Sequence, residues 1–423
     1  MTPSARVQSV LDLLEALARE SRPADGLLAA WLRARRYIGS KDRAAISTRF
    51  YAVLRHFRRL DWSLARHQIP MTPRARLLAW LALGEGIAAT DLATLFSGGT
   101  YAPAALTSDE LKAWRKLQGH TLTHPSMPED VQTECPPALF APLKQKFGAA
   151  FLKEMQAMLE PAPLDLRVNL LKMTQEAALQ DLRAAGLKAE ICPFSPVGLR
   201  VFGRPSLNTL PMLKDGAIEI QDEGSQLVAL AVEAKPGERI VDFCAGAGGK
   251  TLALGAMMAN KGRIIACDIS EKRLRSGTAR FRRAGLHNIE TRTLVGTRDP
   301  WVKKHKESFD RVLADAPCSG TGTWRRNPDT RGSQLGPSLP DLLKTQAEIL
   351  DSAARLVKKG GRLVYATCSL LPEENEDQIA AFLAAHPDFS VVPCGMNGAD
   401  FLSLTPHRHG TDGFFAAALE RGV

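Results

Sequence analysis

The sequence predicts an α/β protein in which a doubly wound domain follows an all-helical domain. In residues 4–145, apolar residues recur at helical spacing, without strand-like alternation. From Gln221 onward, strand-like and helix-like segments alternate, which is typical of a parallel sheet covered by helices on both faces. A glycine-rich loop, DFCAGAGGKT at 242–251, follows the first of these strands and opens a helix. We therefore expect a ligand site in the carboxyl-terminal half.

The amino-terminal part, residues 1–140, is predicted to be a helical domain. Helices are expected at VQSVLDLLEALA (7–18), at AAISTRFYAVLRHFRRLDW (44–62) and at RARLLAWLALGEG (74–86). The Pro-rich stretch CPPALFAP (135–142) is predicted to be a linker that ends this domain.

Residues 141–220 are predicted to form a small α+β segment. A helix from Pro142 to Leu159 leads to an extended stretch, PAPLDLRVNLLKM, and a second helix ends at Gly186. Short strands are expected around AEICPF, GLRVF and GAIEIQD.

Residues 221–423 carry the alternating pattern. Their strands end at Asp268 in GRIIACDIS, at Asp315 in FDRVLADAPC and just before Cys368 in GGRLVYATCS. The expected helices are KRLRSGTARFRRAG, LPDLLKTQAEILDSAARLV and EENEDQIAAFLAAHP. Because the carboxyl ends of parallel strands share one edge of a sheet, we expect these polar side chains to lie together.

The charge of the chain favours a polyanionic partner. The 423 residues have a net charge of +10, and residues 1–76 hold 15 Lys and Arg against 6 Asp and Glu. Arginine pairs with phosphate in a bidentate way, so the pattern favours nucleic acid over the alternative of a solvated helical surface. Most of this charge comes from Arg33, Arg35, Arg36, Arg43, Arg49, Arg55, Arg58 and Arg59.

Other features exclude several classes of protein. No run of eighteen apolar residues is present, and the first twenty residues carry acids in place of a signal peptide's basic start. Seven cysteines without a C-x-x-C pair predict reduced thiols and no metal site. We therefore expect a cytoplasmic protein with no membrane partner.

The glycine loop limits the classes of ligand that the site can bind. A phosphate-binding P-loop would need glycine where Cys244 stands, and the dinucleotide fingerprint would need glycine at Thr251. Asp268, about twenty residues on, suits a ribose diol. The pattern favours a nucleoside without pyrophosphate, which S-adenosylmethionine satisfies, and disfavours a nicotinamide dehydrogenase. A purely structural glycine turn is the alternative.

Two cysteines follow strand ends, and both suit methylation of carbon 5 of a pyrimidine. This carbon is a weak nucleophile until a thiolate adds to C6. A carboxyl such as Asp315 can stabilise the adduct through N3. A second thiol can assist elimination as an acid or a base. From the residues alone, either Cys318 or Cys368 can be the nucleophile.

Five ordered motifs resemble the Sun/NOL/NOP family of RNA cytosine-5 methyltransferases over residues 140–423. They are QDEGSQL (221–227), DFCAGAGGKT, DAPCSGTG with RRNPDTR (325–331), VYATCSLLPEEN (364–375) and GTDGFFAAAL (410–419). LRVNLLK (166–172) resembles the family's RRM-like segment. The basic helical front resembles the NusB-like RNA-binding domain of RsmB-like members, which act on small-subunit (16S) rRNA.

The resemblance implies a Rossmann-like methyltransferase domain and a role for each motif residue. Cys368 would be the nucleophile, Cys318 would assist release of the product, and Asp315 would contact the cytosine. Lys250 would lie beside the cofactor and the catalytic centre. The residues expected to hold S-adenosylmethionine are Cys244, Ala245, Gly246, Ala247, Gly248, Gly249, Lys250, Asp268 and Asp315.

The chain departs from the family pattern at two positions. Ala247 stands where proline is usual, and Gly296 stands where an Asp usually binds the adenine, so Asp299 is a second candidate for that contact. We expect a monomer, with RNA contacts from Arg167, Asn169, Arg325, Arg326 and Arg331. The alternatives are the same chemistry on tRNA and a non-catalytic RNA-binding assembly factor.

Overall fold

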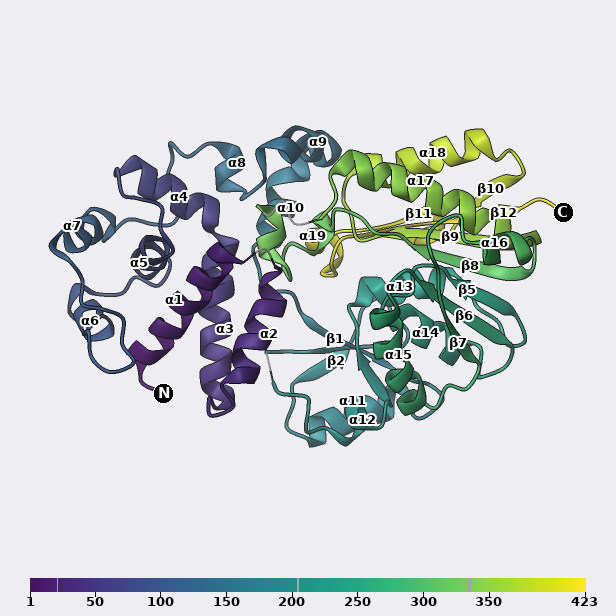
Figure 1. The fold of residues 1–423 in the computed structure, drawn as a ribbon, viewed down its shortest axis with the longest axis horizontal. Coiled ribbons are helices and arrows are strands. Elements are labelled where there is room, and N and C mark those ends of the chain that lie inside the picture. The colour runs from purple at the N-terminus through teal and green to yellow at the C-terminus, as the bar shows by residue number, and fades with distance from the viewer. Residues whose placement is uncertain (21, 204, 333–335) are drawn as a thin grey trace. The chain divides into compact units, whose positions relative to one another are not determined.

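The structure is a computed structural model that describes residues 1–20, 22–203, 205–332 and 336–423 (Figure 1). The chain forms two compact units. The helical unit comprises Met1–Glu160 with Trp324–Gly336, and the α/β unit comprises Pro161–Thr323 with Pro337–Val423. The packing of Trp324–Gly336 with the helical unit does not follow from the sequence pattern. The division at residues 140 and 220 stays a prediction.

The helical unit contains a large apolar core. Its helices α1, α3 and α5 pack around fully buried side chains that include Val10, Phe50 and Leu77. Helix α1 begins after Thr2, whose hydroxyl accepts the N–H of Ala5 at 3.2 Å and so caps the helix. The helices of this unit are α1 (Pro3–Arg19), α2 (Ala24–Ala34), α3 (Ser40–Arg55), α4 (Phe57–Arg66), α5 (Pro73–Leu83), α6 (Ala89–Leu95), α7 (Ser108–Leu117), α8 (Glu129–Gln132), α9 (Pro137–Phe147), α10 (Phe151–Ala157) and the 3-10 turns η1 (Gly148–Ala150) and η3 (Pro328–Arg331).

Two helix predictions and one linker prediction for this unit need correction. The helix expected at 44–62 is broken at His56, which has φ −121° and ψ 23° and joins α3 to α4. The Pro-rich stretch is no linker, because Pro137 begins α9; proline is tolerated in a first turn, where its missing N–H has no helical partner. The helix expected from Pro142 to Leu159 is interrupted at Gly148, which has φ +50°.

The α/β unit opens with a small antiparallel sheet of order β2-β3-β1-β4. Helix α11 and the sheet enclose a separate core around Leu166, Leu182 and Ile218. The elements are β1 (Leu164–Val168), α11 (Gln175–Ala184), β2 (Ala189–Ile191), β3 (Gly198–Val201), α12 (Pro211–Lys214) and β4 (Ile218–Ile220).

The large sheet has the order β10-β12-β9-β8-β5-β6-β7, with β11 paired to β12. Strands β5 to β9 are parallel, as predicted, but β10, β11 and β12 pair antiparallel, so the sheet is mixed. The elements are α13 (Glu223–Ala231), β5 (Arg239–Asp242), α14 (Gly249–Met257), β6 (Arg263–Asp268), α15 (Glu271–Ala284), β7 (Ile289–Thr293), α16 (Pro300–Lys304), β8 (Phe309–Asp315), η2 (Thr321–Thr323), α17 (Leu339–Leu356), β9 (Val357–Thr367), η4 (Pro372–Glu374), α18 (Glu376–Ala385), β10 (Phe389–Val392), η5 (Met396–Gly398), β11 (Phe401–Leu404), α19 (Pro406–His409) and β12 (Phe414–Arg421).

Helices cover both faces of the large sheet, which confirms the predicted Rossmann-like architecture (Figure 1). Helices α16, α17 and α18 pack on one face, where Trp301, Ile349 and Ile379 join its core. Helices α13 and α14 pack on the other face through Val228 and Leu254, and α15 lies beside α14. Among the described residues, no helix is long and apolar enough to span a membrane. Because the helices cover only the two faces of the sheet, the carboxyl ends of its parallel strands stay open between the helix layers.

Candidate active site

A pocket of about 540 Å³ lies at the carboxyl ends of the parallel strands. It brings together Cys244, Asp268, Asp315, Cys318 and Cys368, which the sequence had placed at four different strand ends. Its other lining residues are Phe243, Ile269, Arg273, Leu294, Gly296, Thr297, Ala316, Pro317, Thr345, Glu348 and Ile349.

The two strand-end thiols touch. Cys318 follows β8 and Cys368 follows β9, its parallel neighbour, and their Sγ atoms are 3.4 Å apart. Both are free thiols. The hydrogen bond with Cys368, together with burial, raises the pKa of Cys318 well above the ordinary value for a thiol. Cys318 therefore stays protonated in this conformation, and either thiol can donate the hydrogen of this contact.

Two glycines allow the cysteine loops to lie this close. The N–H of Gly322 donates to the carbonyl of Cys368 at 2.9 Å, and the N–H of Gly413 donates to the carbonyl of Gly322 at 2.8 Å. A Cβ atom on Gly322 would lie 2.2 Å from the carbonyl oxygen of Gly413. The glycines of SGTG and TDGFF thus join three chain segments behind the thiols.

Glu374 holds the Cys318 loop from the other side. This fully buried carboxylate accepts the backbone N–H of Ser319 at 2.8 Å and the Ser319 hydroxyl at 2.5 Å. The amide of Gln346 donates to Glu374 at 2.9 Å and to the carbonyl of Pro317 at 3.0 Å. The PEEN motif by itself assigns no role to Glu374, but its contacts show that Glu374, together with Gln346, fixes Pro317 and Ser319, the residues on both sides of Cys318.

Lys250 forms an ion pair with Asp315, which lines the pocket. Lys250 Nζ lies 2.6 Å from Asp315 Oδ2, and the lysine side chain is only 11% exposed. Burial alone would lower the pKa of Lys250, but the charge of Asp315 and its hydrogen bond outweigh burial and raise the pKa. The ammonium group therefore stays charged beside the carboxylate that faces the pocket.

The glycine loop turns around the carboxylate of Asp268. Asp268 accepts the N–H of Gly246 and the N–H of Ser270, each at 2.8 Å. Gly246 has φ +56° and Gly248 has φ +78°, the left-handed region that favours glycine. At Ala247, where proline is usual in the family, Arg280 holds the carbonyl oxygen at 2.7 Å. An arginine contact therefore restrains the turn in the absence of the proline ring.

The carboxyl group of Asp242 anchors the loop from below. It is fully buried and accepts the hydroxyl of Thr251 at 2.6 Å. Burial raises the pKa of Asp242 to about 7, against the opposing effect of the Thr251 hydrogen bond. This contact joins the end of β5 to the first turn of α14 and so fixes both ends of the loop.

Only one of the two candidates for the adenine contact lies in the pocket. Gly296 lines the pocket, whereas Asp299 is outside it and caps α16, accepting the N–H groups of Val295 at 2.9 Å and Trp301 at 2.8 Å. Sequence reasoning missed Ile269, which lines the pocket and is 74% exposed. The signal for it was available, because Ile269 is an apolar residue directly after the strand-end acid.

The predicted RNA contacts are mostly buried. Arg167 donates to Gln221 at 2.6 Å, and the amide of Asn169 donates to two backbone carbonyls. Arg331 donates to the carbonyl of Met158 at 2.8 Å. Arg325 is buried as well, and Arg326 is half-buried. These contacts give Arg167, Asn169 and Arg331 a structural function, and contact of any of the five with RNA stays a prediction.

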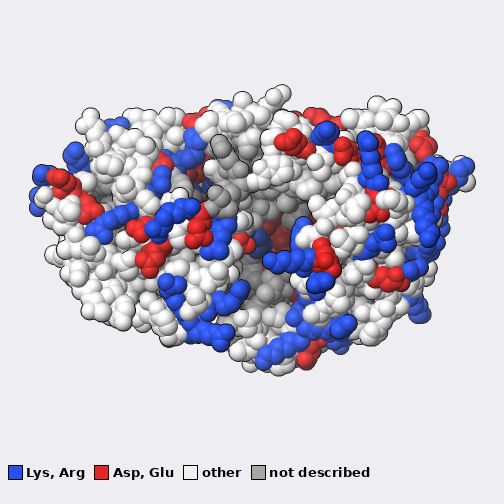
Figure 2. All heavy atoms as spheres, in the orientation of Figure 1, with Lys and Arg blue, Asp and Glu red and all other residues white. Residues whose placement is uncertain are grey.

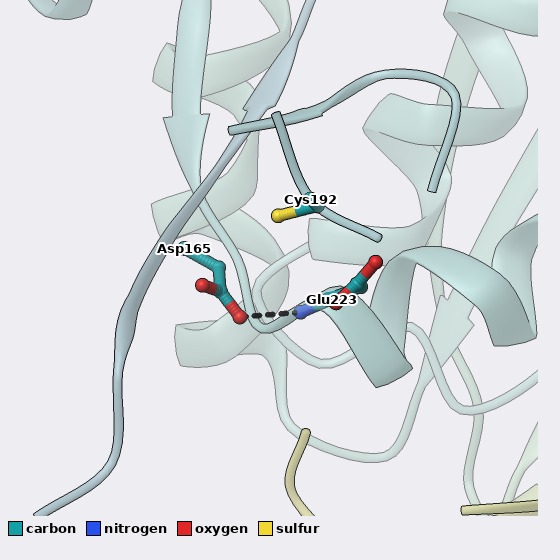
Figure 3. Close-up of side chains that lie close together, drawn as sticks. All are labelled: Asp165, Cys192 and Glu223. Atoms are coloured by element: carbon teal, nitrogen blue, oxygen red, sulfur yellow. Dashed lines mark hydrogen bonds between the residues drawn. The ribbon is translucent and has the colours of Figure 1, made fainter. Parts of the chain in front are cut away.

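Among the described residues, one group of side chains has ligand atoms spaced as in a metal site (Figure 3). Asp165, Cys192 and Glu223 offer atoms within 4.8 Å of one another. However, Arg200 lies 2.8 Å from Asp165 and 3.4 Å from Glu223, so a cation already sits between the carboxylates. Burial raises the pKa of the Cys192 thiol, which disfavours a thiolate ligand. The group is better described as a buried ion-pair cluster.

The pocket fits S-adenosylmethionine. Asp268 supplies a carboxylate at the β6 end where a ribose diol can bind, and exposed Ile269 supplies an apolar surface for a purine. Gly246, with no side chain, allows close approach of the loop backbone. The thiols lie in the same pocket, so a nucleoside-bound methyl group and a base can meet there.

Two family models and a curated relative match this chain. The family model described as 16S rRNA methyltransferase RsmB/F matches residues 229–420, and the RsmF/B-like ferredoxin-like domain matches residues 135–206. Ribosomal RNA small subunit methyltransferase B of Yersinia pseudotuberculosis serotype O:1b (strain IP 31758) is 31% identical over 396 residues, covering 90% of this chain and 91% of that protein.

Two solved structures share the fold over long stretches. The structure of PH0851 has a TM-score of 0.81 and 26% identity, covering 100% of this chain and 99% of that one. A methyltransferase homolog from Pyrococcus horikoshii has a TM-score of 0.61 and 29% identity, covering 71% of this chain and 100% of that one. With the relative from Yersinia matched along nearly its whole length, this chain belongs to the RsmB/F family of 16S rRNA methyltransferases, which use S-adenosylmethionine.

Proposed function

We propose that this chain methylates carbon 5 of a cytosine in 16S rRNA, with Cys368 as the nucleophile and Cys318 as the residue that assists product release. The observation that carries the proposal is the 3.4 Å contact between the two thiols in the pocket that also contains Asp268 and Asp315. We further propose that the protein works in the cytoplasm as a monomer.

The geometry suits addition to the cytosine ring. The thiolate of Cys368 forms a bond to C6, and electron density moves to C5 and N3. Asp315, paired with Lys250 at 2.6 Å, can accept a hydrogen bond from the exocyclic amine of the cytosine, and from N3 once N3 carries a proton, and so stabilise the adduct. S-adenosylmethionine, when bound, supplies the methyl group that C5 takes.

Release of the product needs a second group. The proton on C5 must leave and the bond between C6 and the Cys368 sulfur must break. Cys318 is held against that sulfur by the glycine contacts and by Glu374. It can donate its proton to the departing sulfur of Cys368 and then, as a thiolate, take the proton that leaves C5, which restores the Cys318 thiol.

The substrate is tested directly with two RNAs. Purified protein is incubated with S-adenosylmethionine and either 16S rRNA or tRNA, and bisulfite sequencing then reads every cytosine. We expect one or a few protected cytosines in 16S rRNA and none in tRNA. Protected cytosines in tRNA alone would instead favour the alternative in which the protein methylates tRNA. Binding of 16S rRNA with no protected cytosine favours the non-catalytic assembly factor.

The turn between α2 and α3 is proposed as an RNA contact of the helical unit. Arg33 at the end of α2, Arg36 in the turn and Lys41 at the start of α3 are exposed, and Tyr37 in the turn is 78% exposed. The acid next in sequence, Asp42, is already bound by the amino terminus and by Arg6. Basic side chains form several separate clusters on the visible face, so a local test is needed (Figure 2).

We predict that the triple variant R33Q/R36Q/K41Q binds 16S rRNA less tightly and with a weaker salt dependence. Each lost phosphate contact lowers the magnitude of the slope of log affinity against log salt by roughly 0.7–0.9, so for three contacts we expect a decrease of about 2 to 3. Filter binding at several KCl concentrations measures the slope. The variant K112Q/R115Q/K116Q on α7 removes the same charge and controls for net charge. Equal slopes for the two triple variants would contradict a local contact.

A further inference from the structure

The carboxylate of Glu348 lies in the cofactor pocket without an evident task. Glu348 is on α17, far in sequence from the glycine loop, and lines the pocket beside Gly296 and Thr297. The hydroxyl of Thr297 donates to Glu348 Oε2 at 3.2 Å. The side chain is half-buried. A carboxylate in such a place has oxygens to offer to a ligand.

The other two carboxylates of the lining already have partners. Asp315 is bound by Lys250 at 2.6 Å, at the thiol end of the pocket. Asp268 receives two backbone N–H groups at the glycine loop. Among the described ion pairs, none includes Glu348, whose hydrogen-bond partner is a neutral hydroxyl. Glu348 is therefore the lining carboxylate with the most acceptor capacity left.

The surroundings of Glu348 suit the edge of a flat heterocycle. Leu294 and Ile349 are buried apolar residues of the pocket lining, and exposed Ile269 follows the acid that is expected to bind the ribose. Gly296 has no side chain, and a Cβ there would meet no atom within 4 Å. The loop after β7 therefore contributes open space, and the acceptor that an exocyclic amine needs comes from another element.

We propose that Glu348 accepts a hydrogen bond from the exocyclic amine of the cofactor's adenine and thereby selects adenine over purines that lack this amine. The inference rests on the proposed function, in which this pocket holds S-adenosylmethionine. Thr297 positions the carboxylate by its hydroxyl. A residue on α17 thus supplies the polar contact that neither Gly296 nor Asp299 supplies.

A pair of ligands that differ at this one position tests the proposal. S-adenosylhomocysteine carries the amine donor, whereas S-inosylhomocysteine carries a carbonyl oxygen there, which meets a carboxylate unfavourably. Titration calorimetry gives the Kd of each ligand, and the ratio of the two is the readout. Wild-type protein is expected to prefer the adenosyl ligand by roughly ten- to a hundred-fold, the effect of leaving buried polar groups unpaired.

The variant Glu348→Gln should lower the preference for the adenosyl ligand over the inosyl ligand. Its amide can donate to the inosyl carbonyl, so we expect weaker adenosyl binding, tighter inosyl binding and a ratio that falls at least about tenfold. Asp351→Asn is the matched control, because Asp351 is on the same helix but pairs with His386 at 2.8 Å and does not line the pocket. It should keep the wild-type ratio.

The failure of this inference can be told from the failure of the site. Asp268→Asn should raise the Kd of both ligands by similar factors, because both ligands carry the ribose. If Asp268→Asn does so while Glu348→Gln keeps the wild-type ratio, the site stands and the role of Glu348 is wrong. If Asp268→Asn changes neither Kd, the cofactor assignment of the pocket is wrong. Thermal unfolding without ligand verifies that each variant is folded.

Discussion

Replacing Cys368 with alanine is expected to abolish methyl transfer, lowering kcat by about 10⁴-fold or more, as for loss of a covalent nucleophile. Carbon 5 of cytosine takes a methyl group only after C6 has gained a nucleophile, and alanine offers none. Cys318, although 3.4 Å away, should not replace it, because its pKa is raised and it belongs to a different loop. Transfer of tritium from labelled S-adenosylmethionine to 16S rRNA measures the loss.

Cys394→Ala is the matched control for this variant. Cys394 is a free, part-buried cysteine of the same unit that does not line the pocket. Its variant should keep wild-type turnover. Wild-type turnover of Cys368→Ala would reassign the nucleophile, and Cys318→Ala would then be the inactive variant.

The periodic parts of the chain were predictable because a single packing surface determines them. Helix α15 alternates buried Leu274 and Phe281 with exposed basic residues, which is the pattern the sequence shows. The strands before Asp268 and Asp315 are short apolar runs between helices, so their parallel pairing followed. The antiparallel pairing of β12 could not be predicted in this way. Its run of buried apolar residues is compatible with either strand direction.

Contacts between distant segments set the limit of prediction. Residues Trp324–Gly336 lie between two strands of the α/β unit in sequence but pack with the helical unit, where Arg331 binds the carbonyl of Met158. A motif that reads as a basic, RNA-facing segment is in this way partly a structural contact. Nothing in the spacing of RRNPDTR distinguishes the two functions.

The residues of the active site also differ in whether the sequence predicts them. Asp268, Asp315, Cys318 and Cys368 were predictable because strand ends meet at one edge of a sheet. Glu348 was not, because it comes from a helix that reaches the pocket only through packing. Glu374 has the same origin in a turn after β9, and its partner Ser319 is 55 residues away in sequence.

Replacing Cys318 with alanine is expected to separate methyl transfer from product release. The first methyl transfer should proceed, because Cys368 and the Lys250–Asp315 pair are unchanged. Breakage of the C6–S bond should slow by roughly 10²–10⁴-fold, the usual effect of losing a positioned acid or base. The enzyme should therefore stall after one methyl transfer, with the RNA still bound covalently. A denaturing gel with labelled RNA and S-adenosylmethionine should show this adduct as a slower band.

The double variant C318A/C368A distinguishes this adduct from non-covalent retention of RNA, because without Cys368 no C6–S bond forms and the slower band must disappear. A Cys318→Ala protein that turns over repeatedly without an adduct would show that elimination uses another group. The thiol contact would then serve to hold Cys368 in place. If the adduct forms, the loop contacts of Gly322, Gly413 and Glu374 gain a catalytic meaning, since they keep Cys318 within 3.4 Å of the sulfur that must depart. The protein would then use separate strand ends to start and to finish one reaction.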